Sequence, residues 1–150
     1  MTSRFPAPLR WTTFVLAVAG LGIAAYLTYE HVTGSTSLAC PATGRIDCAK
    51  VTSSSYSSVL GIPVELLGLG FFVALVALTS PPAWRSRHRA VDALRWAAVV
   101  AGLVAVFYLV WAELYRIHAI CLWCTGVHVI VVLEFVAVLF AYALHDPEAR

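Results

Sequence analysis

Four long apolar segments constrain the fold of this chain more than any other feature of its sequence. They run from about 11 to 29, 62 to 79, 93 to 115 and 120 to 144. A helix needs about 20 apolar residues to span a bilayer, and in lipid only a helix or a closed barrel satisfies its own backbone. The runs are too long for barrel strands and do not alternate. The sequence therefore predicts an all-α integral membrane protein with a bundle of four transmembrane helices.

Composition agrees with this fold class. Of the 150 residues, 61% are hydrophobic and 12% are charged, whereas soluble domains average about 45–50% apolar and 25% charged residues. The length leaves room for one compact domain, so we expect residues 1–150 to form a single membrane domain. Pro81 and Pro82 should end the second helix, because proline lacks the N–H that would continue it. A net charge of +2 without a basic block predicts no nucleic-acid partner.

The basic residues predict an orientation. Arg4 and Arg10 precede the first run, and four arginines crowd the link between the second and third runs and its edge: Arg85, Arg87, Arg89 and Arg95. The other two loops hold Arg45, Lys50 and Arg116, which are nearly offset by Glu30, Asp47 and Glu113. Cytoplasmic loops carry an excess of Arg and Lys. We therefore expect a multi-pass protein of the inner (cytoplasmic) membrane with both termini in the cytoplasm. The long loop 31–61 and the short turn before the fourth helix should face outward.

All four cysteines then lie on the outer side, where disulfides form and persist. Cys40 and Cys48 are in loop 31–61, with Pro41 and Gly44 between them, and a flexible loop of this kind suits a disulfide that forms and breaks. A loop of this length more often carries a function than serves as a passive connection.

Cys121 and Cys124 form a Cys-Leu-Trp-Cys motif at the start of the fourth helix. Positions i and i+3 share a helix face, so the pair can be a disulfide or a cooperating dithiol. The helix N-terminus favours the thiolate, which is the form that attacks a disulfide or a quinone ring. Two cysteine pairs that can meet at a membrane edge, beside lipid-soluble acceptors, indicate thiol–quinone electron transfer with a quinone from the membrane pool.

Two other classes of protein fit the cysteines. A CxxC also occurs in zinc sites, so a non-enzymatic metal-binding membrane protein remains an alternative, with the four cysteines or His128 as ligands. The wide Cys40–Cys48 spacing fits poorly with the short knuckles of structural zinc, and we expect no metal. The second alternative is a structural subunit whose cysteines only staple the loop to the fourth helix. Thr125 stands where a c-type haem motif would need His.

Polar residues near the cysteines are candidate quinone ligands. His128 lies one turn deeper than Cys124 on the same face, where it either bonds a neighbouring helix or serves a quinone oxygen or a proton. The run 51–58 is either a solvated linker or a short amphipathic segment over the bundle, in which Ser54 and Tyr56 supply hydroxyls to a ligand carbonyl.

Two acidic residues lie within the apolar runs. Glu65, just inside the second helix, is positioned to face the same cavity as His128. Glu134 lies near the middle of the fourth helix, and we expect a hydrogen-bonded structural carboxyl there. Carboxyl groups at such depth are costly unless they are paired or functional.

Over nearly its whole length the chain resembles the bacterial form of the vitamin K epoxide reductase family. The resemblance rests on the loop pair Cys40 and Cys48 and on three stretches: Cys48-Ala-Lys-Val-Thr-Ser-Ser-Ser-Tyr56, Gly61-Ile-Pro-Val-Glu-Leu-Leu-Gly68 and Cys121-Leu-Trp-Cys-Thr-Gly-Val-His128. It implies four helices with both termini inside. It also implies a membrane thiol–disulfide oxidoreductase that supports disulfide formation outside the cytoplasm.

The resemblance further implies a role for each cysteine. Cys124 would react with the quinone, Cys48 would exchange with Cys121, and Cys40 would meet a thioredoxin-like protein. Many bacterial members carry a fused thioredoxin-like domain, which these 150 residues lack, so we expect a separate partner.

The resemblance also concerns the quinone, which would be menaquinone, ubiquinone or a vitamin K-like compound. Ser54 matches the family's hydroxyl near the bound quinone, and His128 stands where animal members carry Tyr. Val64 stands where animal members place Asn, which weakens the case for epoxide chemistry. Reduction of a quinone or a quinone epoxide as the main role is therefore an alternative to disulfide formation.

Overall fold

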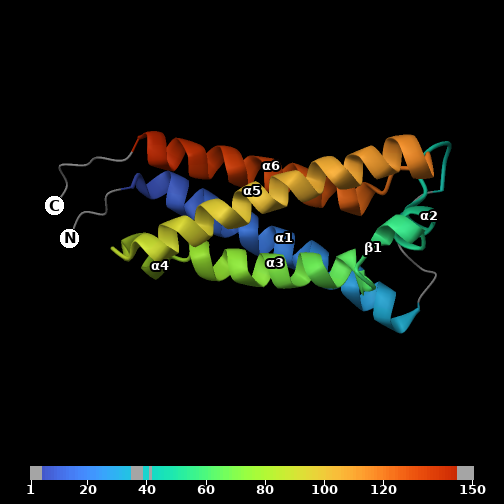
Figure 1. Cartoon of the computed structure of the whole chain (residues 1–150), viewed down its shortest axis with the longest axis horizontal. Helices are drawn as coiled ribbons and strands as arrows, with labels where there is room; N and C mark the ends of the chain where they lie inside the picture. The colour runs from blue at the N-terminus through green and yellow to red at the C-terminus, as the bar shows by residue number, and fades with distance from the viewer. Residues whose placement is uncertain (1–4, 35–38, 41, 145–150) are drawn as a thin grey trace.

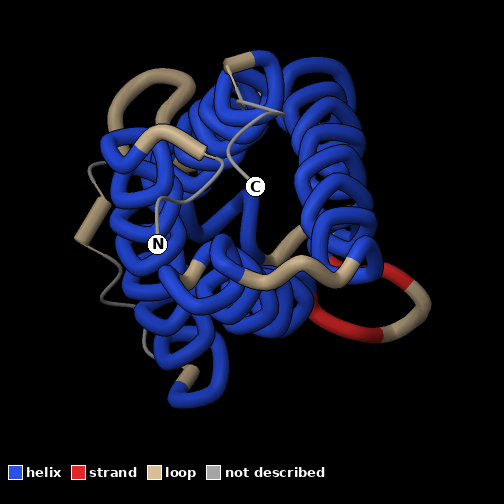
Figure 2. The backbone as a smooth tube through the Cα atoms, turned by 90° about the vertical axis from the view of Figure 1, so that its left-hand side faces the viewer, coloured by secondary structure: helices blue, strands red, loops and turns tan. Residues whose placement is uncertain are grey.

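A computed structural model of the chain describes residues 5–34, 39–40 and 42–144. Its long helices pack side by side in an elongated bundle, seen from the side in Figure 1 and along its axis in Figure 2. They are α1 (Ala7–Thr33), α3 (Val64–Thr79), α5 (Arg89–Trp111) and α6 (Leu122–Ala143). The shorter elements are α2 (Cys48–Thr52), η1 (Ser55–Ser57), β1 (Ser58–Val59), β2 (Ile62–Pro63), α4 (Pro81–Arg85) and the π-helix η2 (Ala112–Ile117).

The short elements mark two different ends of the bundle (Figure 1). The end formed by 39–40, 42–63 and 112–124 carries α2, η1 and the β1–β2 hairpin, and we call it the cysteine end. The opposite end, formed by α4, the first turns of α5 and the last turn of α6, is the arginine end. Helix α1 begins at the arginine end and runs towards the cysteine end (Figure 1).

Three helices of the described chain are long and apolar enough to cross a membrane: Ala7–Thr33, Arg89–Ile117 and Leu122–Ala143. This supports the predicted all-α membrane protein. The fourth predicted span, α3, is a shorter apolar helix of 16 residues, or about 24 Å at 1.5 Å per residue. The prediction began this helix at 62, but Ile62 and Pro63 instead pair with Val59 and Ser58 in a hairpin.

Turn and proline chemistry set the ends of α3. Leu60 and Gly61 join β1 to β2 with φ angles of 54° and 80°, and two consecutive positive φ angles are typical of the tight turns that match strand twist. At the other end α3 stops at Thr79 and Pro81 opens α4, because proline is tolerated in the first turn of a helix but not further in. The predicted stop before Pro81 is confirmed.

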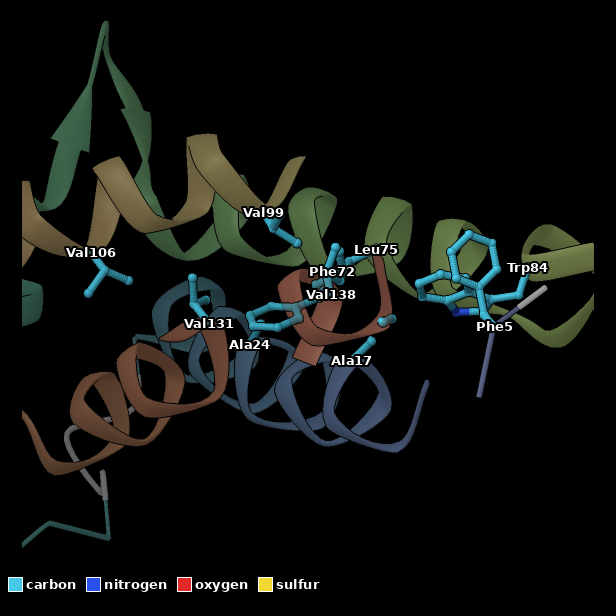
Figure 3. Packing of buried hydrophobic residues seen from close by; sticks show 11 residues of the cluster. Phe5, Ala17, Ala24, Phe72, Leu75, Trp84, Val99, Val106, Val131 and Val138 are labelled. Atoms are coloured by element: carbon cyan, nitrogen blue, oxygen red, sulfur yellow. The ribbon is translucent and has the colours of Figure 1, made fainter. Parts of the chain in front are cut away.

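Helix α1 lies against both α3 and α6, and small residues permit the close approach. A Cβ added to Gly20 would overlap the ring of Phe72, so glycine is required at this crossing. Around it lies the core of the bundle, shown in Figure 3, which includes Ala17, Ala24, Phe72, Leu75, Val99, Val131 and Val138. Small residues at a helix interface gain packing that larger ones would prevent.

Arg95 departs from its predicted role as a loop charge. It lies within α5 and is 0% exposed. Its guanidinium donates hydrogen bonds to the Leu78 carbonyl at 3.0 Å, to Asp92 at 2.9 Å and to the Tyr142 hydroxyl at 2.8 Å. Its Cζ atom also lies 3.7 Å from the ring centroid of Trp84. Arg95 is therefore a structural residue that ties α3, α5 and α6 together.

Glu134 also departs from expectation. It is buried in α6, and among the described residues neither of its carboxyl oxygens has a hydrogen-bond partner, although the Ala17 backbone faces it. The expected hydrogen bond of a structural carboxyl is therefore not formed.

Candidate active site

The two cysteine pairs meet in one apolar cluster at the cysteine end. Its buried members are Cys48, Val51, Ala112, Ile117, Ala119 and Cys121, and Cys40, Tyr56, Trp123 and Cys124 pack against them. Cys40 and Cys48 form a disulfide, whereas Cys121 and Cys124 are free thiols. A loop cysteine and a helix cysteine distant in sequence therefore share one dry environment.

Backbone pairing holds the loop against the start of α6. Ile46 forms a parallel bridge with Ile120. The Asp47 N–H donates to the Ile120 carbonyl at 3.1 Å, and the Ile120 N–H donates to the Arg45 carbonyl at 2.8 Å. Cys48 and Cys121 directly follow the bonded residues in the sequence, so this short ladder brings the two cysteines together. No local sequence pattern predicts such pairing between distant segments.

The CxxC motif begins α6 through its own sulfur. Cys121 is the N-cap of the helix, and its Sγ accepts a hydrogen bond from the Cys124 N–H at 3.2 Å. A hydrogen bond from the Cys124 thiol lowers the pKa of Cys121, as the N-terminal turn of a helix also tends to do. The helix begins at Leu122 and not at the predicted 120, because Ile120 is engaged in the bridge to the loop.

A second contact fixes the chain next to Cys40. The Trp123 indole N–H donates to the Ala39 carbonyl at 3.2 Å, and the Ala39 N–H donates to the Tyr26 hydroxyl at 3.3 Å. The rings of Tyr26 and Trp123 lie with centroids 4.9 Å apart. Trp123, which lies between the two cysteines of the motif, therefore anchors the segment that leads to Cys40.

The segment after Cys48 covers the end of the bundle. Helix α2 buries Val51, and in η1 the Tyr56 hydroxyl accepts a hydrogen bond from Arg116 at 2.6 Å. The Arg116 guanidinium also lies 5.5 Å from the Tyr56 ring and 5.9 Å from the Trp111 ring. The run 51–58 is therefore a packed lid of short helical turns, as predicted by its amphipathic interpretation.

Beneath the lid lies a cavity of about 290 Å³. It is lined by one cysteine, Cys124, and by all four residues predicted to contact a quinone: Ser54, Tyr56, Glu65 and His128. The rest of the wall is mainly apolar, with Leu67, Phe71, Phe72, Val106, Val127 and Val131. Small-molecule sites usually have apolar walls with a few convergent polar groups. An isoprenoid quinone suits such a site, because it is mostly apolar and carries two carbonyl oxygens.

Within the serine run, the wall of the cavity includes Ser54 and Ser57, whereas Ser53 and Ser55 are exposed. The Ser54 hydroxyl donates to the Val51 carbonyl at 2.8 Å, and the Ser57 hydroxyl donates to the Ser54 carbonyl at 2.6 Å. Each hydroxyl oxygen keeps lone pairs that can accept a further bond. Ser57 was not predicted as a site residue, although it lies three positions from Ser54.

Glu113 is a second residue that the sequence did not predict. It is buried in η2, lines the cavity, faces the Cys121 backbone N–H and lies close enough to Cys121 and Cys124 for its charge to act on both thiols. In the sequence it reads as one more charge at the end of an apolar run. The π-helical turn η2 directs the Glu113 side chain towards the cavity and Cys121, and sequence alone does not show this. Such turns are frequent at functional sites.

No group of three or more His, Cys, Asp and Glu side chains within 5–34, 39–40 and 42–144 is placed to hold a metal ion.

One comparison with known proteins bears on this site. The model of the vitamin K epoxide reductase family matches residues 11–139, which include the loop cysteines, the lid, the cavity wall and the CxxC motif. Membership of this oxidoreductase family agrees with free and bonded cysteines gathered beside a cavity among apolar helices. The chain belongs to the vitamin K epoxide reductase family.

Proposed function

We propose that this protein is a membrane thiol–disulfide oxidoreductase that passes electrons from an external dithiol to a membrane quinone and so supports disulfide formation outside the cytoplasm. Cys40 and Cys48 receive the electrons, and Cys121 and Cys124 deliver them. The quinone ring occupies the cavity lined by Cys124, with Ser54, Tyr56, Glu65 and His128 around it. One observation carries the proposal: Cys124 lines the cavity while its partner Cys121 packs with the loop cysteine Cys48.

The reaction balances as two successive transfers. A dithiol donor reduces the Cys40–Cys48 disulfide and leaves as a disulfide. The Cys48 thiolate then attacks Cys121 of an oxidised Cys121–Cys124 pair, and Cys124 leaves as a thiolate. Attack of Cys40 on Cys48 restores the loop disulfide and frees Cys121. The reduced pair finally closes to a disulfide and gives two electrons to the quinone, which takes up two protons to become quinol.

The described bonding corresponds to one state of this cycle. The loop pair is bonded and the helix pair is free, which is the state after the loop disulfide has re-formed and before the quinone is reduced. In this state the hydrogen bond from the Cys124 thiol lowers the pKa of Cys121 and so favours its thiolate form.

The membrane arrangement is part of the same proposal. Residues 1–150 form one membrane domain, α3 is its fourth span, and both termini face the cytoplasm. The positive-inside rule supports this orientation through Arg85, Arg87 and Arg89 beside the arginine end. The cysteine end then faces outward, where a separate thioredoxin-like protein reaches Cys40. Helix α3 packs against α1 at two levels, with Phe72 against Gly20 and the Glu65 carbonyl bonded to the Thr28 hydroxyl, which supports a span despite its 16 residues.

The test is quinol formation by the purified protein with a reduced thioredoxin-like donor and a short-chain quinone. We expect one quinol for each donor disulfide. Each of the four Cys→Ala variants should lose this activity. In Cys124→Ala the Cys121 thiolate can still attack Cys48 of the loop disulfide and displace Cys40 as a thiolate. The resulting Cys48–Cys121 bridge should accumulate, because Cys124 is absent to release it, and should be visible on a non-reducing gel after proteolysis.

A small membrane-permeant dithiol separates the two cysteine pairs. It reaches the helix pair directly, so Cys40→Ala and Cys48→Ala should regain quinone reduction with it, whereas Cys121→Ala and Cys124→Ala should not. Full function of Cys124→Ala with the protein donor would support the structural-subunit alternative. Stoichiometric zinc in protein purified without chelator would favour the metal-binding alternative.

A further inference from the structure

Electron transfer through the sulfur atoms leaves one requirement unmet. When Cys48 and Cys40 attack as thiolates, both of their protons go to the solvent at the loop. Quinol formation in the cavity needs two protons. One is carried by Cys124, which takes up a proton after it leaves as a thiolate and then donates a hydrogen bond to Cys121. A second proton must reach the cavity by another route.

Glu65 occupies the place where such a route would end. It lines the cavity together with Cys124 and His128. Among the described residues neither of its carboxyl oxygens has a hydrogen-bond partner. When no donor bonds a buried carboxyl group, burial costs the charged carboxylate more free energy than the neutral acid. The group therefore keeps its proton. Glu65 therefore enters the reaction as an acid.

His31 connects this carboxyl to the solvent. Its Nδ1 lies 3.9 Å from the Glu65 Oε2, and the side-chain exposure falls from 39% at His31 to 3% at Glu65. The gap is one that a bridging water or a small change of rotamer closes. His31 is also in the last turn of α1. A helix of 27 residues is about 40 Å long, whereas the hydrocarbon core is about 30 Å thick. The last turn can therefore extend beyond the hydrocarbon core.

A specific contact keeps these two residues together. The Thr28 hydroxyl, one turn before His31 in α1, donates to the backbone carbonyl of Glu65 at 3.1 Å. This bond joins the C-terminal part of α1 to the first turn of α3. The other titratable groups in the described wall of the cavity are Tyr56, Tyr108, Glu113, Cys124 and His128.

We propose that Glu65 is the proton donor to the quinone and that His31 reprotonates it from the outer solution. This inference rests on the proposed function. In the step itself, the Cys121 thiolate and the Cys124 thiol close to a disulfide and release two electrons. The Cys124 proton goes to one quinone oxygen and the Glu65 proton to the other, so that quinol, a disulfide and the Glu65 carboxylate result. Glu65 then takes a proton from protonated His31, and His31 takes one from water.

The experiment uses the full chain in detergent, a permeant dithiol and a short-chain quinone. Glu65→Gln should lower kcat by about 100-fold, the scale of a lost general acid, with the quinone KM unchanged. Its solvent deuterium isotope effect should rise, and added formate should restore part of the rate. His31→Asn should give a smaller loss of the same kind. Reduction of the Cys121–Cys124 disulfide by the dithiol, followed by alkylation, should match the wild type in both variants.

Glu134→Gln is the matched control, because Glu134 is buried in the same bundle but does not line the described cavity. Its kcat should equal that of the wild type. A wild-type kcat for Glu65→Gln, or a loss confined to Glu113→Gln, would overturn the inference and leave the proposed function intact. A raised KM with unchanged kcat would also overturn it, because it would mean a binding role only. Absence of quinol from the wild type would instead refute the proposed function.

Discussion

The two ends of this bundle treat buried charged residues in opposite ways. At the arginine end, Arg95 is fully buried and each of its guanidinium nitrogens donates a hydrogen bond, to Leu78, Asp92, Tyr142 or Ala83. At the cysteine end, the buried Glu65 has no hydrogen-bond partner for either oxygen among the described residues, and it lines a cavity. The first arrangement fixes a structure, and the second leaves a group ready to react.

The difference follows from how each side chain is solvated. A buried charge costs several kcal/mol unless hydrogen bonds replace the lost water. Arg95 receives that replacement from residues of α3, α4, α5 and α6 and from the Trp84 ring. A carboxyl can avoid the cost by keeping its proton, which arginine cannot do. Incomplete hydrogen bonding is therefore tolerated at a carboxyl that exchanges a proton, and it would not be tolerated at Arg95.

The largest effect expected from this contrast is on stability at the arginine end. Arg95→Met should reduce the free energy of unfolding by about 3 kcal/mol, because it removes the hydrogen bonds that the buried guanidinium donates to the Leu78 and Ala83 carbonyls and to Asp92. Unfolding of the purified protein in a denaturing-detergent titration would measure this. Arg89→Met, an exposed arginine of the same helix, should change it by less than about 0.5 kcal/mol.

Glu65→Gln sharpens the same contrast from the other end. It should leave the free energy of unfolding unchanged or slightly higher in that titration, because it breaks no hydrogen bond of the side chain. A loss as large as that of Arg95→Met would show that the two ends do not differ in this respect.

A smaller effect is expected where Trp123 holds the loop. Trp123→Phe removes the hydrogen bond to the Ala39 carbonyl but keeps a ring against Tyr26. Loss of a single hydrogen bond of about 1 kcal/mol should raise the exchange rate of the Ala39 amide about fivefold. Hydrogen exchange followed by mass spectrometry would detect it. The control is Trp11→Phe, because Trp11 is an exposed tryptophan near the arginine end. An equal rise in the exchange rate of the Ala39 amide in Trp11→Phe would contradict a local anchoring role for Trp123.

The smallest effect concerns the acidity of Cys121. Its pKa lies below that of an ordinary thiol because the Cys124 thiol donates a hydrogen bond to it. Thiolate ultraviolet absorbance of the reduced helix pair should therefore rise at lower pH than for a free thiol, with Cys121→Ala as the blank. Cys124→Ala should move the midpoint upward, and an unchanged midpoint would remove this explanation.

The same shift has a consequence for stability. Because the folded chain binds the Cys121 proton less tightly than the unfolded chain, its contribution to stability is fully present above the pKa of an ordinary thiol. The contribution is lost as the pH falls through the lowered Cys121 midpoint.

Much of the fold was predictable because its signals are local. Apolar runs located the long helices to within a few residues, and Pro81 marked the end of α3. Helical spacing placed Cys124 and His128 on one face, and both line the cavity. Ser54, Tyr56 and Glu65 were chosen as candidates from their position beside apolar runs and from family resemblance, and they line it as well.

Other features were not predictable because they depend on partners distant in sequence. The pairing of Ile46 with Ile120, the burial of Arg95 and the direction of Glu113 each require a second segment. A charged residue reads the same in sequence whether it is solvated or enclosed. The hairpin at Ile62 was not predicted, because an apolar residue at this boundary is as typical of a short strand as of the first turn of a helix.

The sequence by itself determined that this chain forms apolar helices with two cysteine pairs near one end, because chain length, hydropathy and spacing act along the chain. Only the tertiary structure decided which cysteine lines the cavity, which lies beside the loop, and which buried charges are enclosed by donors. Those properties depend on distances between helices, and the packing of side chains such as Phe72 against Gly20 sets those distances.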